Sequence, residues 1–253
     1  MNNIQKHLEK AIKVNPEYSE AHYELGIIFS EKKEYKLAKQ HLLKVTKIDP
    51  DFAMAYFHLA LLYKKFKDNK KSKEYFIKSI DLDPNFADSY YQYGLLLIDM
   101  EEYEDAKIYL EKTTDIDQNY YQAYFHWAEL LVDPEDYEKA KKNYLIAIDI
   151  KDNYIDAHFY LAKLLIGGLK NDKNGILVEK PEYDLAIKHL KKIIKLKKYF
   201  VQAYYLLGVI YRIEKQYDVS LKYLKKALGI NDNYAKAHFE IAMLYRNIMD
   251  NRN

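Results

Sequence analysis

The stretch from Ser19 to Phe52 reads SEAHYELGIIFSEKKEYKLAKQHLLKVTKIDPDF, and its apolar residues fall into two groups. In the first group, around Leu25 and Phe29, they recur every three or four residues, which is typical of one face of an α-helix. A second group with the same spacing surrounds Leu42. Because a proline disfavours helical geometry in the residue before it, the second helix is predicted to end just ahead of Pro50. The stretch therefore predicts two helices joined by a short turn.

This stretch is one copy of a repeat. Small residues mark one position in the first predicted helix of every copy: Gly26, Ala60, Gly94, Ala128, Ala162, Gly208 and Ala242. Successive members are 34 residues apart, apart from one interval of 46. A second series marks the second helix: Ala38, Ser72, Ala106, Ala140, Ala186 and Ser220. Both series place a twelve-residue insertion between Ala162 and Ala186, and small residues at both positions allow the paired helices to approach closely.

The repeat predicts one continuous solenoid over residues 1–253. Its units are a half-unit at 1–18, hairpins at 19–52, 53–86, 87–120, 121–154, 155–200 and 201–234, and a half-unit at 235–253. The insertion falls near 167–181, in the turn of the fifth hairpin, and includes three consecutive aliphatic residues at 176–178. Three interpretations stay open: a passive loop, a segment that packs back onto the fold, or a segment that docks on a partner. Since a single hairpin cannot bury its own apolar face, neighbouring hairpins are expected to stack.

The order of these residues resembles the tetratricopeptide repeat family, and the resemblance covers almost the whole chain. It rests on Leu25, Gly26, Phe29, Tyr35, Ala38, Leu42 and Pro50. The family's usual tryptophan is replaced by other rings at His22, Tyr56, Tyr90, Tyr124, His158, Tyr204 and His238. The resemblance implies an all-α fold, a right-handed superhelical solenoid of antiparallel helix hairpins, and a function in protein–protein interaction.

Composition and motifs argue against catalysis. The net charge of +2 and the aromatic residues of the first helices do not favour nucleic-acid binding. The sequence has no cysteine, which excludes disulfides and thiolate metal sites. No apolar run approaches the roughly 20 residues of a membrane helix, so we expect no membrane insertion and a cytoplasmic location. The eight histidines form no HExxH motif, and no glycine pattern suits a phosphate. We therefore predict a non-enzymatic protein with no cofactor and no metal.

The candidate binding residues lie on a stripe beside the core face of the first helices. Every first helix places an aromatic residue there: Tyr23, Phe57, Tyr91, Phe125, Phe159, Tyr205 and Phe239. One turn later five of them carry an apolar residue: Ile27, Leu61, Leu95, Val209 and Met243. Family resemblance implies that this stripe lines a concave groove. The rings could serve packing alone, but contiguous exposed apolar area favours a surface that binds a protein or peptide partner.

Two further expectations concern the partner. Family members that hold chaperone tails grip the terminal carboxylate with lysine, asparagine and arginine from this stripe, whereas the first units here offer Tyr23, Ile27, His58, Asp88 and Gln92. A chaperone tail is therefore not expected. The alternative function is that of a structural subunit of a larger assembly, because the terminal helices keep apolar residues such as Leu8 and Leu244 that would normally meet a neighbour. End-to-end self-association is predicted on this ground.

Overall fold

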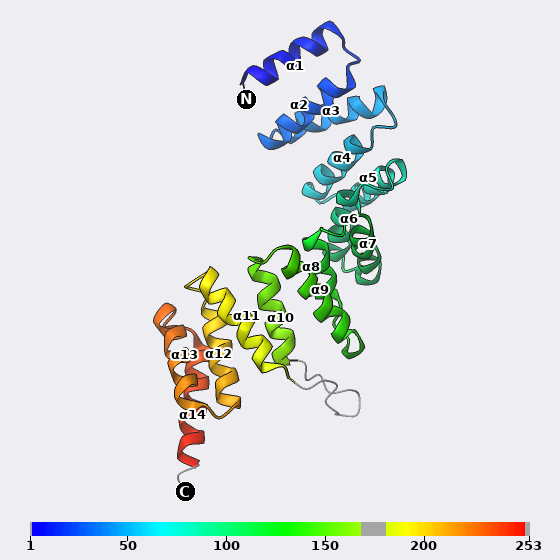
Figure 1. Ribbon diagram of the computed structural model, residues 1–253. Coiled ribbons are helices and arrows are strands. Elements are labelled where there is room, and N and C mark those ends of the chain that lie inside the picture. Colours follow the sequence, from blue (N-terminus) through cyan, green and yellow to red (C-terminus); the bar gives the residue numbers. More distant parts are fainter. Residues whose placement is uncertain (1, 168–180, 251–253) are drawn as a thin grey trace. The chain divides into compact units, whose positions relative to one another are not determined.

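The structure, a computed structural model, describes residues 2–167 and 181–250. Every regular element in these residues is a helix, and consecutive helices pair as antiparallel hairpins, so the predicted fold class is confirmed (Figure 1). The chain divides into two compact units, Met1–Ala123 and Tyr124–Asn253, referred to as unit 1 and unit 2. Most of the predicted insertion near 167–181 lies at 168–180, outside the described residues.

The first helix of each repeat is called the A helix. The A helices are α2 (Ser19–Glu31), α4 (Ala53–Lys65), α6 (Ala87–Asp99), α8 (Tyr121–Leu130), α10 (Ile155–Gly167), α12 (Val201–Ile213) and α14 (Ala235–Asp250). The second helix is called the B helix. The B helices are α1 (Asn2–Val14), α3 (Tyr35–Ile48), α5 (Asn69–Leu82), α7 (Tyr103–Ile116), α9 (Tyr137–Ile150), α11 (Tyr183–Leu196) and α13 (Tyr217–Ile230).

One hairpin departs from the regular pattern. The helix α8 has 10 residues where the other A helices of complete hairpins have 13, and a 3₁₀ helix, η1 (Pro134–Asp136), follows it. The sequence explains the early end, because Pro134 restrains Asp133 from helical geometry. The regular spacing of the repeat had predicted an ordinary hairpin at 121–154.

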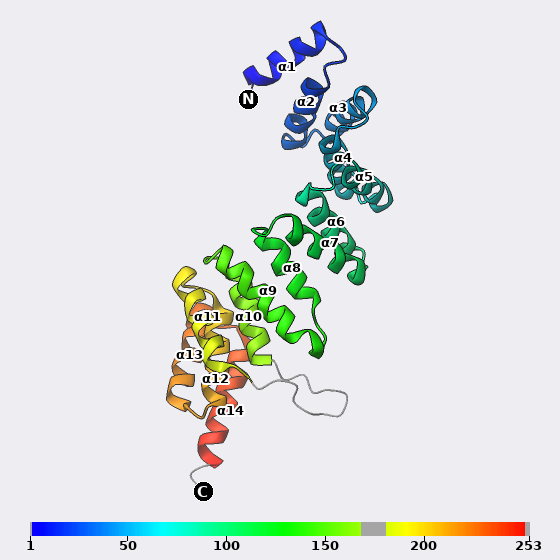
Figure 2. The ribbon, with the colours of Figure 1, turned by 45° about the vertical axis from the view of Figure 1, so that its right-hand side comes forward.

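Close approach of the A and B helices explains the small residues. A methyl group added to Gly26 would lie 2.8 Å from Leu42 Cγ, and one added to Gly208 would lie 2.6 Å from Leu224 Cγ. The second small position also contacts the A helix, since the hydroxyl of Ser220 donates to the Gly208 carbonyl over 2.7 Å. Helices α12 and α13, which carry the last of these pairs, lie side by side in both views (Figures 1 and 2).

The turns between A and B helices share an unusual backbone. Lys33, Lys67, Glu101 and Lys215 have φ between 60° and 64°, in the left-handed region that favours glycine. All four occupy the same repeat position, directly before the residue that caps the B helix. The turn therefore accommodates lysine or glutamate in a strained conformation and does not require glycine at this position.

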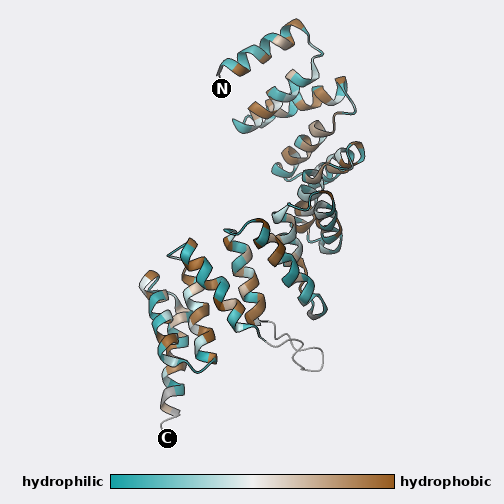
Figure 3. Ribbon diagram, in the orientation of Figure 1, coloured by the Kyte–Doolittle hydropathy of each residue, from teal (hydrophilic) through white to brown (hydrophobic). Residues whose placement is uncertain are grey.

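Each unit has its own apolar core between neighbouring helices. In unit 1 the cluster includes Leu25, Leu42 and Leu59, all fully buried. In unit 2 the corresponding cluster includes Leu224 and Leu244. Hydrophobic and hydrophilic residues alternate along the helices (Figure 3), as expected where each helix buries one face and exposes the other.

Candidate partner-binding surface on the A helices

The structure places the predicted rings at very different depths. The side chains of Tyr23, Phe57, Tyr91 and Phe125 are buried, each with 8% or less of its surface exposed. Those of Phe159 and Tyr205 are half-buried. The last ring of the series, Phe239, is 64% exposed. Most of the rings therefore offer a partner little of their own surface.

Six of the seven rings pack against an aromatic residue that lies directly before the next A helix, and this contact covers part of each ring. The pairs and their ring-centroid distances are Tyr23–Phe52 at 5.0 Å, Phe57–Phe86 at 5.0 Å, Tyr91–Tyr120 at 4.8 Å, Phe125–Tyr154 at 5.1 Å, Phe159–Phe200 at 5.3 Å and Tyr205–Tyr234 at 5.4 Å. Contacts of this kind join one hairpin to the next within a unit. We name these contacts the ring pairs.

The aliphatic residues beside the ring pairs are more accessible. In unit 1, Ile27, Leu61 and Leu95 are half-buried, each one turn after a buried ring on α2, α4 or α6. In unit 2, Val209 and Met243 hold the same position and are also half-buried. The stripe therefore consists of partly exposed aliphatic side chains over rings that are largely covered.

Two A helices of unit 2 carry charged or polar residues at the aliphatic position. In α8 Glu129 takes this place, with Oε2 2.9 Å from Nδ1 of His126. In α10 Lys163 takes it, with its ammonium 5.8 Å from the centre of the Phe159 ring and 5.0 Å from that of Tyr160. The apolar stripe of unit 1 is thus more uniform than that of unit 2.

Polar contacts along the same helices were not recognised from the sequence. In unit 1 the Lys64 ammonium lies 2.9 Å from the Asp99 carboxylate, which joins α4 to α6. In unit 2 Arg212 Nε donates to Glu240 over 2.6 Å, which joins α12 to α14. In the sequence, these contacts could have been recognised as opposite charges about one repeat apart on successive A helices.

A hydrogen bond to an exposed carboxylate accompanies one ring pair. The hydroxyl of Tyr120 donates to Asp88 Oδ1 over 2.6 Å. Burial and the neighbouring carboxylate raise the pKa of Tyr120 well above its ordinary value, so the phenol stays protonated. The residue is therefore a structural donor rather than a proton-transfer group.

Two pairs of histidines are also structural. His22 and His41 approach through their Nδ1 atoms at 3.0 Å, and His158 and His189 do so at 2.7 Å. In each A helix the histidine Nε2 donates to a backbone carbonyl six residues earlier, which fixes Nδ1 as the acceptor for the second ring. Burial lowers the pKa of His41, His158 and His189, which favours these neutral rings.

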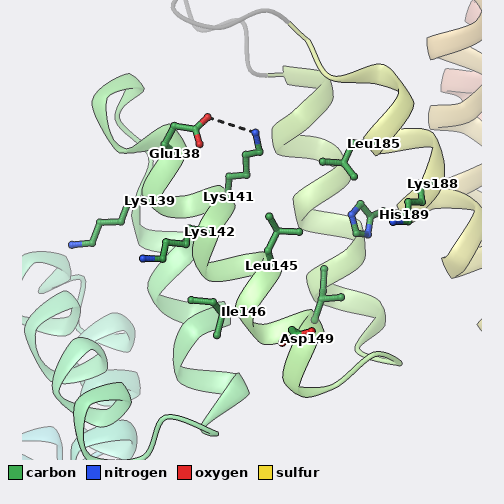
Figure 4. Close-up of a pocket in the computed structure, with 11 residues that line it drawn as sticks. Glu138, Lys139, Lys141, Lys142, Leu145, Ile146, Asp149, Leu185, Lys188 and His189 are labelled. Atoms are coloured by element: carbon green, nitrogen blue, oxygen red, sulfur yellow. Dashed lines mark ion pairs between the residues drawn. The ribbon is translucent and has the colours of Figure 1, made fainter.

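On the other side of unit 2 a cleft of about 870 Å³ lies between the B helices α9 and α11 (Figure 4). Aliphatic side chains such as Leu145 and Leu185 line it, together with lysines of both helices. Lys141 is paired there with Glu138 at 3.6 Å and with Glu182. The cleft is thus an apolar groove with a basic rim, separate from the A-helix stripe.

The described residues hold no group of three or more histidine, aspartate or glutamate side chains arranged to bind a metal ion. Among them, none of the helices has the length and hydropathy that a membrane span requires.

Comparisons with known proteins agree with the repeat. One sequence model of the tetratricopeptide repeat matches residues 53–86 and 201–234, and a second matches 7–40 and 75–108. No curated protein matches the sequence.

Several solved structures share the fold. The C-terminal part of a TPR repeat-containing protein from Cytophaga hutchinsonii has a TM-score of 0.74 at 15% identity, with 95% of each chain covered. PilF of Pseudomonas aeruginosa has a TM-score of 0.68 at 18% identity, covering 89% of this chain and 97% of its own. YrrB has a TM-score of 0.66 at 20% identity, covering 78% and 96%. These structures show the shared fold, and the matches to the two repeat models, together with the 34-residue spacing, show that the chain belongs to the tetratricopeptide repeat family.

Proposed function

We propose that this chain is a non-enzymatic scaffold that binds an extended or helical segment of another protein along the A-helix stripe. The observation that carries the proposal is the recurrence of partly exposed aliphatic residues, Ile27, Leu61 and Leu95, over buried ring pairs in unit 1. A row of apolar contacts at a fixed repeat spacing suits a partner whose own apolar side chains recur along a segment.

The ring pairs serve this surface indirectly. Because Tyr23, Phe57 and Tyr91 are held by the next hairpin, they fix the spacing of the A helices and leave the aliphatic residues as the atoms that touch the partner. In unit 2 the contact set we propose is Phe159, Tyr205, Val209, Phe239 and Met243, of which Phe239 is the most accessible, and the buried Phe125 serves the surface indirectly like the rings of unit 1. A rigid surface loses little entropy on binding, which favours affinity.

Charge around the stripe suggests the composition of the partner. On α2 the acidic residues Glu20, Glu24 and Glu31 are exposed beside Ile27. A segment with apolar residues flanked by lysine or arginine would complement them and would be steered toward the surface. A chaperone tail is not proposed, since the stripe offers no lysine or arginine at the positions named above.

The relatives and the composition support the same proposal. The family generally supplies scaffolds without catalytic activity, and YrrB is described as a TPR protein with an unusual peptide-binding site. We include a cytoplasmic location in the proposal, which fractionation of cells that express a tagged chain would test.

A peptide selected from a random library against the whole chain provides the test. Leu61→Gln on the stripe is compared with Ile108→Gln, which alters a 61% exposed isoleucine on the B helix α7. We expect Leu61→Gln to raise the Kd at least tenfold, about 1.4 kcal/mol, and Ile108→Gln to leave it unchanged. Circular dichroism confirms that both variants fold. Equal affinity of both folded variants would place binding away from the stripe.

A further inference from the structure

Each end of the described chain carries half a hairpin. Among the described residues, α1 is a B helix with no A helix before it, and α14 is an A helix with no B helix after it. Their outer sides hold exposed apolar residues, with Ile4 60% exposed on α1 and Phe239 64% exposed on α14. Since solenoid ends ordinarily require a polar outer face, these two sides are candidates for an interface.

Residues that face each other within the complete hairpins are matched in type. At one position the A and B residues are His22 and His41, Tyr56 and Tyr75, Tyr90 and Tyr109, Tyr124 and Asn143, His158 and His189, and Tyr204 and Tyr223. The five pairs in which both residues carry rings have centroids 5.0 to 6.5 Å apart. Histidine therefore faces histidine, whereas tyrosine faces tyrosine or stands opposite asparagine.

The unpaired residues at this position are both histidines. In α14 it is His238, whose Nε2 lies 2.8 Å from the Asp232 carbonyl, the same bond that His22 and His158 make. In α1 it is His7, which is exposed. The A helix at one end and the B helix at the other thus carry the two halves of a third histidine pair.

Two other contacts of the complete hairpins are divided between the ends in the same way. Within residues 2–167 and 181–250, Phe239 has no ring after it to form a ring pair. Tyr18, which holds the same repeat position as Phe52 and is 45% exposed, has no ring before it there. The small residue Ala242 is exposed on α14, and Leu8 holds the position of the leucines that cover Gly26 and its equivalents.

We propose that a second copy of this chain completes the open hairpin, with α1 of one copy packed as the B helix on α14 of the next. His7 then pairs with His238, Leu8 covers Ala242 and Tyr18 meets Phe239, each pair across the two copies. Because the two surfaces differ, the contact is heterologous and one copy can be joined at both ends, which generates a ring or a growing chain. The interface shares Phe239 with the partner-binding stripe, whereas His7, Leu8, Tyr18, His238 and Ala242 lie outside it.

One residue of α1 departs from the pattern of the other B helices. Ile4 occupies the B-helix position that holds alanine or serine in the six complete hairpins, where the side chain lies against the A-helix backbone. A larger side chain there holds the helices apart. Ile4→Ala is therefore expected to strengthen self-association several-fold, and weaker association of this variant would contradict the register.

Sedimentation equilibrium of two blocked variants tests the directionality. His7→Glu alters only the α1 side and Phe239→Glu only the α14 side, and both residues are exposed in the single chain. We expect the mass of the wild-type chain to rise with concentration, and each variant alone to associate at least tenfold more weakly. An equimolar mixture should form a dimer and nothing larger, because each variant retains one intact side. Undiminished association of either variant alone, or a mixture that stays monomeric, overturns the proposal.

A disulfide trap detects even weak association, since the chain has no cysteine of its own. In the complete hairpin the Cβ of Gly26 would lie 2.8 Å from Leu42 Cγ, so the two Cβ atoms are at most one C–C bond farther apart, within reach of a disulfide. Leu8→Cys and Ala242→Cys should form a mixed dimer under mild oxidation. The exposed control Lys236→Cys should not pair with Leu8→Cys. Absence of the mixed dimer, or equal trapping of the control, overturns the proposal.

Discussion

Phe57→Ala and Phe239→Ala remove the same ring from the same repeat position at two sites that differ in burial. Phe57 is 8% exposed, and its ring lies 6.0 Å from that of Phe76 and 5.0 Å from that of Phe86. A buried phenylalanine covers roughly 150 to 250 Å², so its loss at about 25 cal/mol per Å² costs about 4 to 6 kcal/mol. Phe239 is 64% exposed, and the same estimate for its buried part gives about 1.5 to 2 kcal/mol.

Urea unfolding followed by circular dichroism would measure the two costs. Because repeat proteins can unfold in steps, hydrogen exchange of the α4 and α14 amides should accompany it and report the local free energy of opening. We expect Phe57→Ala to lower the free energy of opening around α4 by several kcal/mol, and Phe239→Ala to change that around α14 far less. Equal losses at the two sites would refute the conclusion that the ring pairs stabilise the stack.

Three further outcomes follow from single contacts. Gly208→Ala should lower the free energy of unfolding in urea by about 1 kcal/mol, because the added methyl would lie 2.6 Å from Leu224 Cγ and this overpacking outweighs the gain in helix propensity. Gly94→Ala should cost less, since the corresponding distance to Leu110 Cγ is 3.1 Å. A larger loss for Gly94→Ala than for Gly208→Ala would contradict this account. Lys67→Gly should raise the thermal midpoint and add about 0.5 kcal/mol to the free energy of unfolding, because glycine adopts a φ of 60° without strain. A lower thermal midpoint would instead reveal a stabilising contact of the lysine side chain. Burial lowers the pKa of His189 to about 4, so as the pH falls this histidine takes up a proton in the unfolded chain before it does so in the folded one. The contribution of His189 to stability is therefore complete above about pH 6.5 and declines toward pH 4. The free energy of unfolding should differ less between pH 7.5 and pH 5 in His189→Asn than in the wild type. An unchanged difference would exclude this histidine as a source.

The spacing of small residues was enough to predict the helical hairpins, since only close helix packing requires alanine, glycine or serine at both Gly26 and Ala38. The same spacing could not show how deeply a ring is buried. Tyr91 and Phe239 occupy one position of the repeat, yet the first is 7% and the second 64% exposed. Tyr91 packs against the ring of Tyr120, a contact between residues far apart in the sequence that the position within the repeat does not reveal.

The sequence by itself determined the family, the order of A and B helices and the stripe on which the candidate residues lie, because these depend on a periodicity that local helix geometry imposes. The tertiary structure decided which of those residues are accessible and which partners they have. Contacts such as Tyr23 with Phe52 and Arg212 with Glu240 join residues 29 and 28 positions apart, and they form only when neighbouring hairpins stack. Side-chain burial is set by those long-range contacts, so in unit 1 the aliphatic candidates are more exposed than the ring candidates beside them.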